Sequence, residues 1–287
     1  MKVLVLEEQF PPEALAGLDV VHEPADDVAA ILTTPRAPVR AELIAQLPAL
    51  RIVATASVGF DHVDAEAAQA RGIVVRSVPD YCTEEVADHT LAFLFALLRG
   101  IVALDRVVAA GGWDPRAAGP LRTLGGLRVG IVGHGRIGGA VSRRLHALGA
   151  EVWVNDIVEI RRDGVREAPL DELLGECDAV TLHVPLTALT QGMIGARELA
   201  LMRPDAFLLN TARGAVVDVD AVVEALRAGR LGGAALDVLP QEPPSAPPTA
   251  PNLIVTPHAA YYSEAAERRA TAAAVAAVRE ALVWFDR

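Results

Sequence analysis

One stretch, residues 127–156, constrains the fold of this chain more than any other part of the sequence. The apolar run Val129–Val132 predicts a strand, and the glycines after it have the spacing GxGxxG, as Gly133, Gly135 and Gly138. In order, these glycines permit a tight turn, a close approach of the backbone to a pyrophosphate, and close packing of helix on strand. The spacing therefore predicts a strand, a turn and a helix whose N-terminus faces phosphate groups.

The end of this stretch indicates which dinucleotide binds. After Gly149 a second apolar run, Glu151–Val154, predicts a strand that ends at Asn155 and Asp156. A carboxylate at this position accepts hydrogen bonds from both hydroxyls of an adenine ribose and repels a 2′-phosphate. Asp156 therefore favours NAD over NADP, and the whole stretch predicts a dinucleotide-binding βαβ unit.

Length, charge and cysteine content exclude several classes of protein. A chain of 287 residues is long enough for two domains. The net charge of −11 argues against nucleic acid as a partner, because a phosphate backbone requires a basic surface. Cys82 and Cys177 are too few for a disulfide framework, which favours a reducing compartment. No apolar run has the length of a signal peptide core or a membrane span, so we expect a cytoplasmic protein without membrane or metal partners.

Short strands alternating with helices predict a small α/β domain at the N-terminus. We expect strands at 2–6, 19–22, 28–33, 51–56 and 73–76, and helices at 12–16, 39–47 and 64–71. His22 and Val28 are too close for an ordinary parallel crossover, which needs a dozen or more residues. Either a crossover helix has been lost there, or one of the two runs is not a strand.

A long apolar helix is expected to connect the two domains. Thr83 can cap its N-terminus, with Glu84 and Glu85 in the first turn, and the apolar pattern runs to Leu98, with the alternative that it restarts and continues to Ala110. A helix apolar over most of its surface is buried, either between domains or against another subunit, and we therefore expect a homodimer.

The remaining sequence continues the dinucleotide-binding sheet. Further strands are expected at 179–183, 206–210, 233–237 and 253–256, which gives six parallel strands and a doubly wound (Rossmann) sheet. The segment 239–251 is a proline-rich loop, and 263–284 is one long helix. The expected fold class is thus α/β: a dinucleotide-binding domain over 99–258, and a smaller, flavodoxin-like substrate domain made of 1–98 and 259–287.

Polar side chains follow the expected strands of this sheet, at the edge where open α/β sheets bind ligands. They are His183 before Val184 and Pro185, the segment Asn210–Arg213, Asp237, and His258. A guanidinium such as that of Arg213 binds a carboxylate bidentately. Taken singly, Arg213 could pair with Asp218, His258 could be structural, and Glu242 could be an ordinary loop acid. Together, a cation, a carboxylate and an imidazole beside a hydride-carrying cofactor favour catalysis.

These residues lie in motifs that cover almost the whole chain. The motifs are SVGFDHVD (57–64), GHGRIG (133–138) with Asp156, HVPLTALTQGMIG (183–195), NTARGAVVD (210–218), ALDVLPQEP (235–243) and TPHAA (256–260). In this order they resemble the D-isomer-specific 2-hydroxyacid dehydrogenase family. Within it, PDYCTEEVADHT (79–90) and residues 252–266 are most similar to the C-terminal-binding-protein branch, which includes corepressors.

The resemblance implies an NAD-dependent D-2-hydroxyacid dehydrogenase that reduces a 2-keto acid. It implies that Arg213 binds the substrate carboxylate and carbonyl, that His258 gives and takes the proton, and that Glu242 orients and charges His258. It implies substrate contacts from Ser57, Val58 and Gly59. The implied cofactor contacts are Val78, Gly133, Gly135, Arg136, Ile137, Gly138, Asp156, His183, Val184, Pro185, Thr211, Ala212 and Asp237.

Two further hypotheses stay open. One is a corepressor-like interaction protein that senses NAD(H), although the set of Arg213, Glu242 and His258 favours an enzyme. The other is a dehydrogenase of a substrate without a carboxylate, against which Arg213 and the amides after Ser57 argue. The missing crossover between 22 and 28 makes the N-terminal domain smaller than is usual in the family, so the sequence does not predict which keto acid is reduced.

Overall fold

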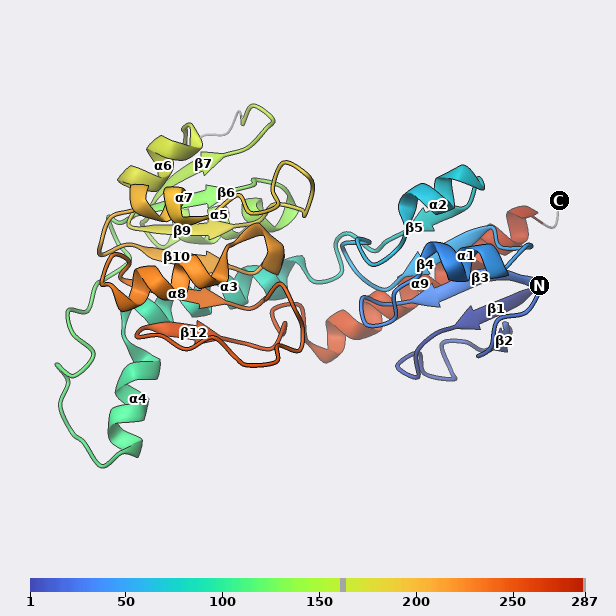
Figure 1. The fold of residues 1–287 in the computed structure, drawn as a ribbon, viewed down its shortest axis with the longest axis horizontal. Coiled ribbons are helices and arrows are strands. Elements are labelled where there is room, and N and C mark those ends of the chain that lie inside the picture. The colour runs from blue at the N-terminus through green and yellow to red at the C-terminus, as the bar shows by residue number, and fades with distance from the viewer. Residues whose placement is uncertain (161–163, 286–287) are drawn as a thin grey trace. The chain divides into compact units, whose positions relative to one another are not determined.

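A computed structural model describes residues 1–160 and 164–285. The chain forms two compact units (Figure 1). The terminal unit consists of Met1–Cys82 together with the segment from Tyr262 onward, and the central unit is Thr83–Tyr261. The helix that the sequence analysis placed at the end of the first domain packs within the central unit. The domain boundaries at 98/99 and 258/259 remain a prediction.

The terminal unit is built on a parallel sheet of five strands in the order β2-β1-β3-β4-β5. Its strands are β1 (Lys2–Val5), β2 (Asp19–Val21), β3 (Val28–Thr33), β4 (Ile52–Thr55) and β5 (Val74–Arg76). Its helices are α1 (Ala41–Gln46), α2 (Ala65–Ala70) and α9 (Glu264–Phe285), and α9 packs on β3 and β4. Every residue of β3 and β4 is buried, as expected of a parallel sheet covered on both faces. The strand order 2-1-3-4-5 confirms the flavodoxin-like expectation.

The segment between His22 and Asp27 contains no helix, and both runs that flank it are strands. The crossover helix is therefore the missing part. The strands β2 and β3 lie on opposite sides of β1, so the connection between them must return along β2 and cross β1. The strand β2 has only three residues and is about 10 Å long. The segment between β2 and β3 can span about 20 Å when extended, which is enough to run back along β2 and cross β1.

The segment Pro12–Ala16 forms turns, and the short helix expected there is wrong. A helix of so few residues is marginal because its nucleation is unfavourable. Gly17, with φ of 79°, follows it directly in a left-handed conformation.

The central unit has a parallel sheet of seven strands in the order β12-β11-β10-β9-β6-β7-β8. The strands are β6 (Arg128–Val132), β7 (Glu151–Asn155), β8 (Val165–Glu167), β9 (Ala179–Leu182), β10 (Phe207–Asn210), β11 (Gly233–Leu236) and β12 (Leu253–Val255). This order confirms the doubly wound sheet, with the strand order reversing between β6 and β9. Six of these strands were predicted; β8 is a short, mostly exposed edge strand without an apolar pattern.

Helices cover both faces of this sheet. They are α3 (Thr83–Leu98), α5 (Arg136–Ala147), α6 (Leu170–Glu176), α7 (Ala196–Leu201) and α8 (Val219–Arg227). The helix α4 (Ile101–Ala109) contacts α3 and has no buried residue, so it covers neither face. One apolar core contains Val180 and Leu208, and another contains their sequence neighbours Ala179 and Leu209, as alternation along buried strands requires. α3 packs beside α5 and against β10 and β11, which explains its apolar surface. Within the described residues, no helix is both long and apolar enough to cross a bilayer.

Candidate active site

The turn between β6 and α5 needs two of its glycines for close packing. Gly133 has φ of 88°, and a Cβ there would lie 2.6 Å from the carbonyl oxygen of His183. A Cβ on Gly138 would overlap the carbonyl oxygen of Gly133. Gly135 differs, because a Cβ there would meet nothing within 4 Å. The protein itself gives no packing reason for a glycine at this position, which fits a ligand that approaches the backbone.

The space beside Gly135 suits a pyrophosphate. No side chain caps the N-terminus of α5, which begins at Arg136, so its first N–H groups remain available to an anion. Asp156 follows β7, and its carboxylate accepts from the backbone N–H of His134 at 2.6 Å and of Val158 at 3.1 Å. These bonds fix a carboxylate beside the glycine turn, where a ribose is expected.

The end of β9 lies against the same turn. Val184 Cγ1 would lie 2.9 Å from a Cβ on Gly133, and the backbone N–H of His183 donates to Val132. The His183 ring is hydrogen-bonded to the Thr181 hydroxyl at 3.0 Å. Burial lowers the pKa of His183 to about 3, so this imidazole is neutral at working pH. Pro185 accepts a hydrogen bond from the Thr190 hydroxyl at 2.6 Å.

The turn after β10 is held by the buried side chain of Asn210. Its Nδ2 donates to the Arg213 carbonyl at 2.9 Å, and its Oδ1 accepts from the Ala212 N–H at 3.0 Å. Arg213 Nη1 donates to the Ala212 carbonyl at 2.8 Å. Asp218, considered above as a partner for Arg213, instead caps α8 by accepting from the N–H of Ala221. Asn210 thus fixes the backbone that carries Arg213.

Gly214 lets the Arg213 turn approach the proline-rich loop. A Cβ on Gly214 would overlap the carbonyl of Leu239 and the nitrogen of Pro240. Glu242 lies three residues beyond Leu239, and the positive charge of Arg213 is one of the interactions that lower the pKa of Glu242. The close contact therefore places the guanidinium and the carboxylate near each other.

Glu242 and His258 form a direct hydrogen bond across the proline-rich loop. Nδ1 of His258 lies 2.6 Å from Oε2 of Glu242, and Oε1 of Glu242 accepts from the Leu239 N–H at 2.8 Å. Burial raises the pKa of Glu242, but the bonds from His258 and Leu239 and the charges of His258 and Arg213 outweigh it. The pKa of Glu242 is therefore below its ordinary value of 4.5, and the carboxylate is ionised at neutral pH.

The backbone of His258 is held by Asp237. His258 has φ of 52°, which is uncommon outside glycine, and its N–H donates to the Asp237 carbonyl at 2.8 Å. The carboxylate of Asp237, only 1% exposed, accepts from the N–H groups of Ala259 and Ala260 at 2.7 and 2.9 Å and from the Thr256 hydroxyl at 2.5 Å. These bonds hold the chain around His258, and the cofactor contact that the resemblance implies for Asp237 remains a prediction.

In the terminal unit, a chain of hydrogen bonds lies beneath Ser57, Val58 and Gly59. The Ser57 hydroxyl donates to the Gly59 carbonyl at 2.6 Å and lies 2.7 Å from the Thr55 hydroxyl, which lies 2.9 Å from Nε2 of His62. The Ser57 carbonyl accepts from the N–H of the buried Val78 at 2.9 Å. In the described part of the chain, the N–H groups of Val58 and Gly59 make no hydrogen bond. Sequence reasoning missed Thr55 and His62.

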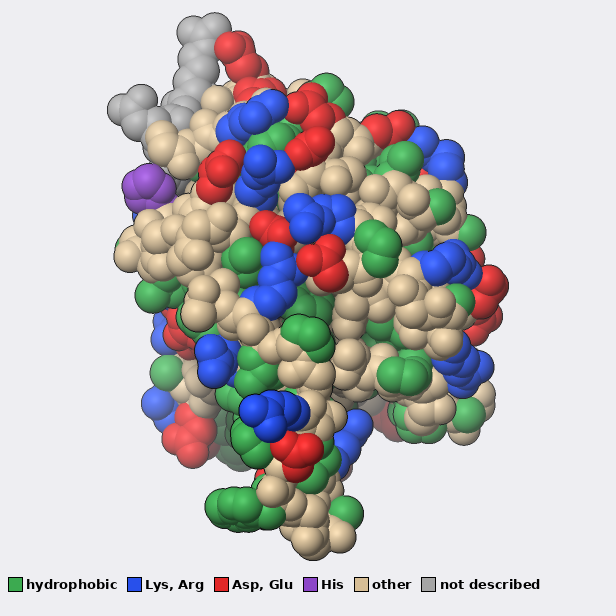
Figure 2. Space-filling model, turned by 90° about the vertical axis from the view of Figure 1, so that its left-hand side faces the viewer, with side chains coloured by type: hydrophobic (Ala, Val, Ile, Leu, Met, Phe, Trp, Pro, Cys, Tyr) green, Lys and Arg blue, Asp and Glu red, His purple; other side chains and the backbone are tan. Residues whose placement is uncertain are grey.

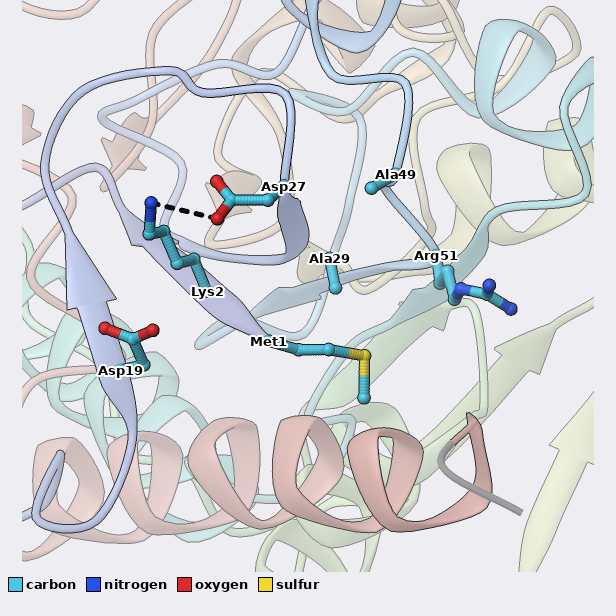
Figure 3. A pocket seen from close by; sticks show the side chains of 7 residues that line it. All are labelled: Met1, Lys2, Asp19, Asp27, Ala29, Ala49 and Arg51. Atoms are coloured by element: carbon cyan, nitrogen blue, oxygen red, sulfur yellow. Dashed lines mark ion pairs between the residues drawn. The ribbon is translucent and has the colours of Figure 1, made fainter.

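A pocket of about 410 Å³ lies elsewhere in the terminal unit (Figure 3). Its lining includes Lys2, Asp27 and Arg51, and Lys2 pairs with Asp27 at 2.9 Å. These residues lie at the amino ends of β1, β3 and β4, opposite the edge where α/β sheets bind ligands. The described residues also hold no cluster of three or more His, Cys, Asp or Glu side chains suited to a metal ion.

The chain is similar to known proteins over most of its length. Residues 91–260 match the D-isomer specific 2-hydroxyacid dehydrogenase, NAD binding domain. A protein named glyoxylate reductase from Korarchaeum cryptofilum is 41% identical over 96% of this chain and 85% of its own. Glycerate dehydrogenase from Methylorubrum extorquens is 40% identical over 80% of this chain and 76% of its own. D-Lactate dehydrogenase from Aquifex aeolicus, solved with NAD and lactic acid, is 31% identical, with a TM-score of 0.91 over 100% of this chain and 96% of that chain.

Proposed function

Since the chain belongs to the D-isomer specific 2-hydroxyacid dehydrogenase family, we propose that Arg213, Glu242 and His258 are the residues with which it transfers hydride between NAD(H) and a 2-keto acid. The observation that carries the proposal is the 2.6 Å hydrogen bond between Nδ1 of His258 and Oε2 of Glu242. It leaves Nε2 of His258 as the ring nitrogen that can meet a substrate. Reduction of a carbonyl by hydride requires a proton donor, and an imidazole held by an ionised carboxylate can serve as one.

NAD(H) supplies the hydride, and the residues of the glycine turn fit it. The open position at Gly135 leaves room for the pyrophosphate, and the N–H groups of Arg136, Ile137 and Gly138 would hold it. Asp156 would accept from the ribose hydroxyls. Val78, His183, Val184, Pro185, Thr211, Ala212 and Asp237 are proposed as further cofactor contacts.

Arg213 is proposed to bind the substrate carboxylate and to stabilise charge on the carbonyl oxygen as hydride arrives. Its guanidinium suits a bidentate contact with a carboxylate. In the terminal unit, we propose that Ser57, Val58 and Gly59 also bind the carboxylate. This role is supported by the hydrogen bond from Ser57 to the Gly59 carbonyl and by the N–H groups of Val58 and Gly59, which make no hydrogen bond to the described residues.

His258 is proposed to donate its proton to the carbonyl oxygen during reduction and to take it back during oxidation. Glu242 keeps the ring oriented through Nδ1 and favours the protonated form through its negative charge. Binding NAD(H) alone needs no proton donor, so this pair favours an enzyme over a dinucleotide sensor. The likeness to the C-terminal-binding-protein branch stays a prediction.

A homodimer is also proposed, through α4 and the loop after it. Seven of the nine residues of α4 are apolar, yet none of them is buried. Ile101 is 56% exposed, Val108 51%, and Trp113 in the following loop 89%. Figure 2 shows hydrophobic side chains on the part of the central unit that projects at the bottom of the view. We propose a second copy of the chain as the partner of this surface, because covering these apolar side chains would remove them from water and stabilise the pair.

We keep the prediction of a reducing, cytoplasmic compartment. Cys82 and Cys177 are buried and form no disulfide within the described residues, and burial raises the pKa of Cys177 to about 12. A thiol held protonated in this way reacts slowly with oxidants in any compartment, so the prediction rests on the cysteine content, which is too low for a disulfide framework.

The experiment that tests the function is a panel of 2-keto acids with NADH. The names of the relatives make glyoxylate and the keto acid corresponding to glycerate the first substrates to try. The expected result is NADH oxidation with at least one of them, lost in His258→Ala while NADH binding persists. NADH binding without turnover of any 2-keto acid would contradict the proposal and favour a sensor.

A further inference from the structure

Two consecutive residues of α3, His89 and Thr90, contact the two turns that carry the proposed catalytic residues. The Thr90 hydroxyl lies 3.1 Å from the hydroxyl of Thr211, in the turn of Arg213. Nε2 of His89 lies 3.2 Å from the hydroxyl of Thr256, two residues before His258. One turn of a buried helix therefore touches both loops at once.

The proton of each hydroxyl in these contacts has a fixed direction. Thr90 donates to the Val86 carbonyl at 2.8 Å, so its oxygen accepts a hydrogen bond from the Thr211 hydroxyl. Thr256 donates to the carboxylate of Asp237 at 2.5 Å, so its oxygen must accept from His89. Nε2 of His89 consequently carries a hydrogen.

Asp237 connects His89 to the backbone around His258. His89 Nε2 also lies 3.9 Å from Oδ1 of Asp237. That oxygen accepts from Thr256 and from the N–H of Ala259, next to His258. His258 depends on these bonds because its backbone has φ of 52°, a conformation that residues other than glycine rarely adopt without support from their surroundings.

Two supports thus act on different parts of His258. Glu242 holds the ring through Nδ1, and Asp237 holds the backbone on both sides of the residue. The His89 ring is itself fixed by an edge contact with Phe93 on the same helix, with ring centroids 4.5 Å apart. A rigid helix is a suitable base for such a support.

We propose that His89 is a positioning residue, which donates from Nε2 to Thr256 and thereby holds Asp237 and the left-handed turn at His258 in the geometry for proton transfer. Together with Thr90, it sets the His258 turn against the Arg213 turn. This inference rests on the proposed function of His258. It predicts an effect on turnover and not on the binding of NADH.

The test compares His89→Phe with His89→Gln, using the keto acid that gives the highest activity in the panel. Phenylalanine keeps a ring against Phe93 but has no donor, whereas the amide of glutamine can donate to Thr256. In His89→Phe, kcat should fall about 10- to 100-fold, the range expected when a reacting group is displaced by about 1 Å. The KM for the keto acid and the NADH dissociation constant should stay at their parental values, and His89→Gln should recover most of the kcat.

Controls separate this inference from a purely structural effect and from failure of the proposed function. Thr256→Val removes the hydroxyl at nearly constant shape and should lower kcat as His89→Phe does, while Thr256→Ser should not. His146→Phe, at an exposed histidine of α5, should change nothing. Parental kcat in His89→Phe, or equal loss in His89→Phe and His89→Gln, would overturn the inference. Turnover that persists in His258→Ala would overturn the proposed function.

Discussion

Gly214 lies so close to Leu239 that a Cβ on the glycine would overlap the Leu239 carbonyl group. The contact joins the turn that follows β10 to the proline-rich loop, and these two segments carry Arg213 and Glu242. A side chain as small as a methyl group would push them apart. The proximity of the cation and the carboxylate therefore depends on the absence of a side chain at this position.

Gly214→Ala should destabilise the protein and reduce its activity. Overpacking against backbone atoms costs about 1–3 kcal/mol in the free energy of unfolding, measured by urea denaturation. Gly135→Ala is the matched control, since its Cβ meets nothing within 4 Å. It should leave the unfolding free energy unchanged but weaken NADH binding, because the methyl group would occupy the space of the pyrophosphate. Equal stability of the two variants would show that the Gly214 contact is not tight.

Cofactor preference should follow Asp156, whose carboxylate is fixed by the N–H groups of His134 and Val158. This charge repels the 2′-phosphate of NADPH, so kcat/KM should be much higher with NADH. In Asp156→Asn the repulsion is removed while the shape is kept, and the preference should narrow. Comparable efficiency of the parent with both cofactors would mean that the ribose does not lie at Asp156.

Much of the central unit could be predicted from the sequence because each level of pattern agrees there. The GxGxxG spacing, the apolar strands and the polar residue after each strand all indicate the same sheet. The terminal unit was harder to predict, since β2 is short and joins β3 without a helix. Pro12–Ala16 has helical composition but too few residues for a stable helix.

The pair of Glu242 and His258 was anticipated, but the support beneath it was not. Asp237 and Thr256 follow the paired strands β11 and β12, and His89 lies on α3, so no spacing in the sequence shows that contact. The same holds for Thr55 and His62 under the Ser57 turn. Side chains that act through other side chains leave little local pattern in the sequence. Polar residues that directly follow apolar strands leave a clear one.

Arg213→Lys should keep the positive charge but lose the planar fork. The substrate carboxylate would then be held by a point charge, with the loss of one charge-assisted hydrogen bond. This loss should raise the activation free energy that kcat/KM measures by about 1.5–3 kcal/mol. NADH affinity, measured by fluorescence, should barely change. Arg268→Lys, at an exposed position on α9, is the matched control and should be silent. An Arg213→Lys variant as efficient as the parent would remove Arg213 from the proposed site.

Sedimentation should show a dimer at micromolar concentration. Val108→Asp places a charge on the exposed apolar face of α4, which should shift the equilibrium to monomer because the charge would have to be desolvated. Val283→Asp makes the same change at a residue of α9 that is 60% exposed, and should leave the dimer intact. A monomeric parent would contradict the proposed role of α4.

The pH dependence of reduction in Glu242→Gln tests the central claim, that Glu242 and His258 together supply the proton. The pKa of Glu242 is below 4.5, so its charge is present at neutral and alkaline pH and favours protonated His258. Glutamine keeps a hydrogen bond but removes the charge beside Nδ1 of His258, so the protonated donor should be stabilised less. The alkaline limb of kcat/KM should therefore move to lower pH, by one unit for about every 1.4 kcal/mol of lost interaction. An unshifted limb would mean that the carboxylate and the imidazole do not act as partners and that His258 is not the donor described.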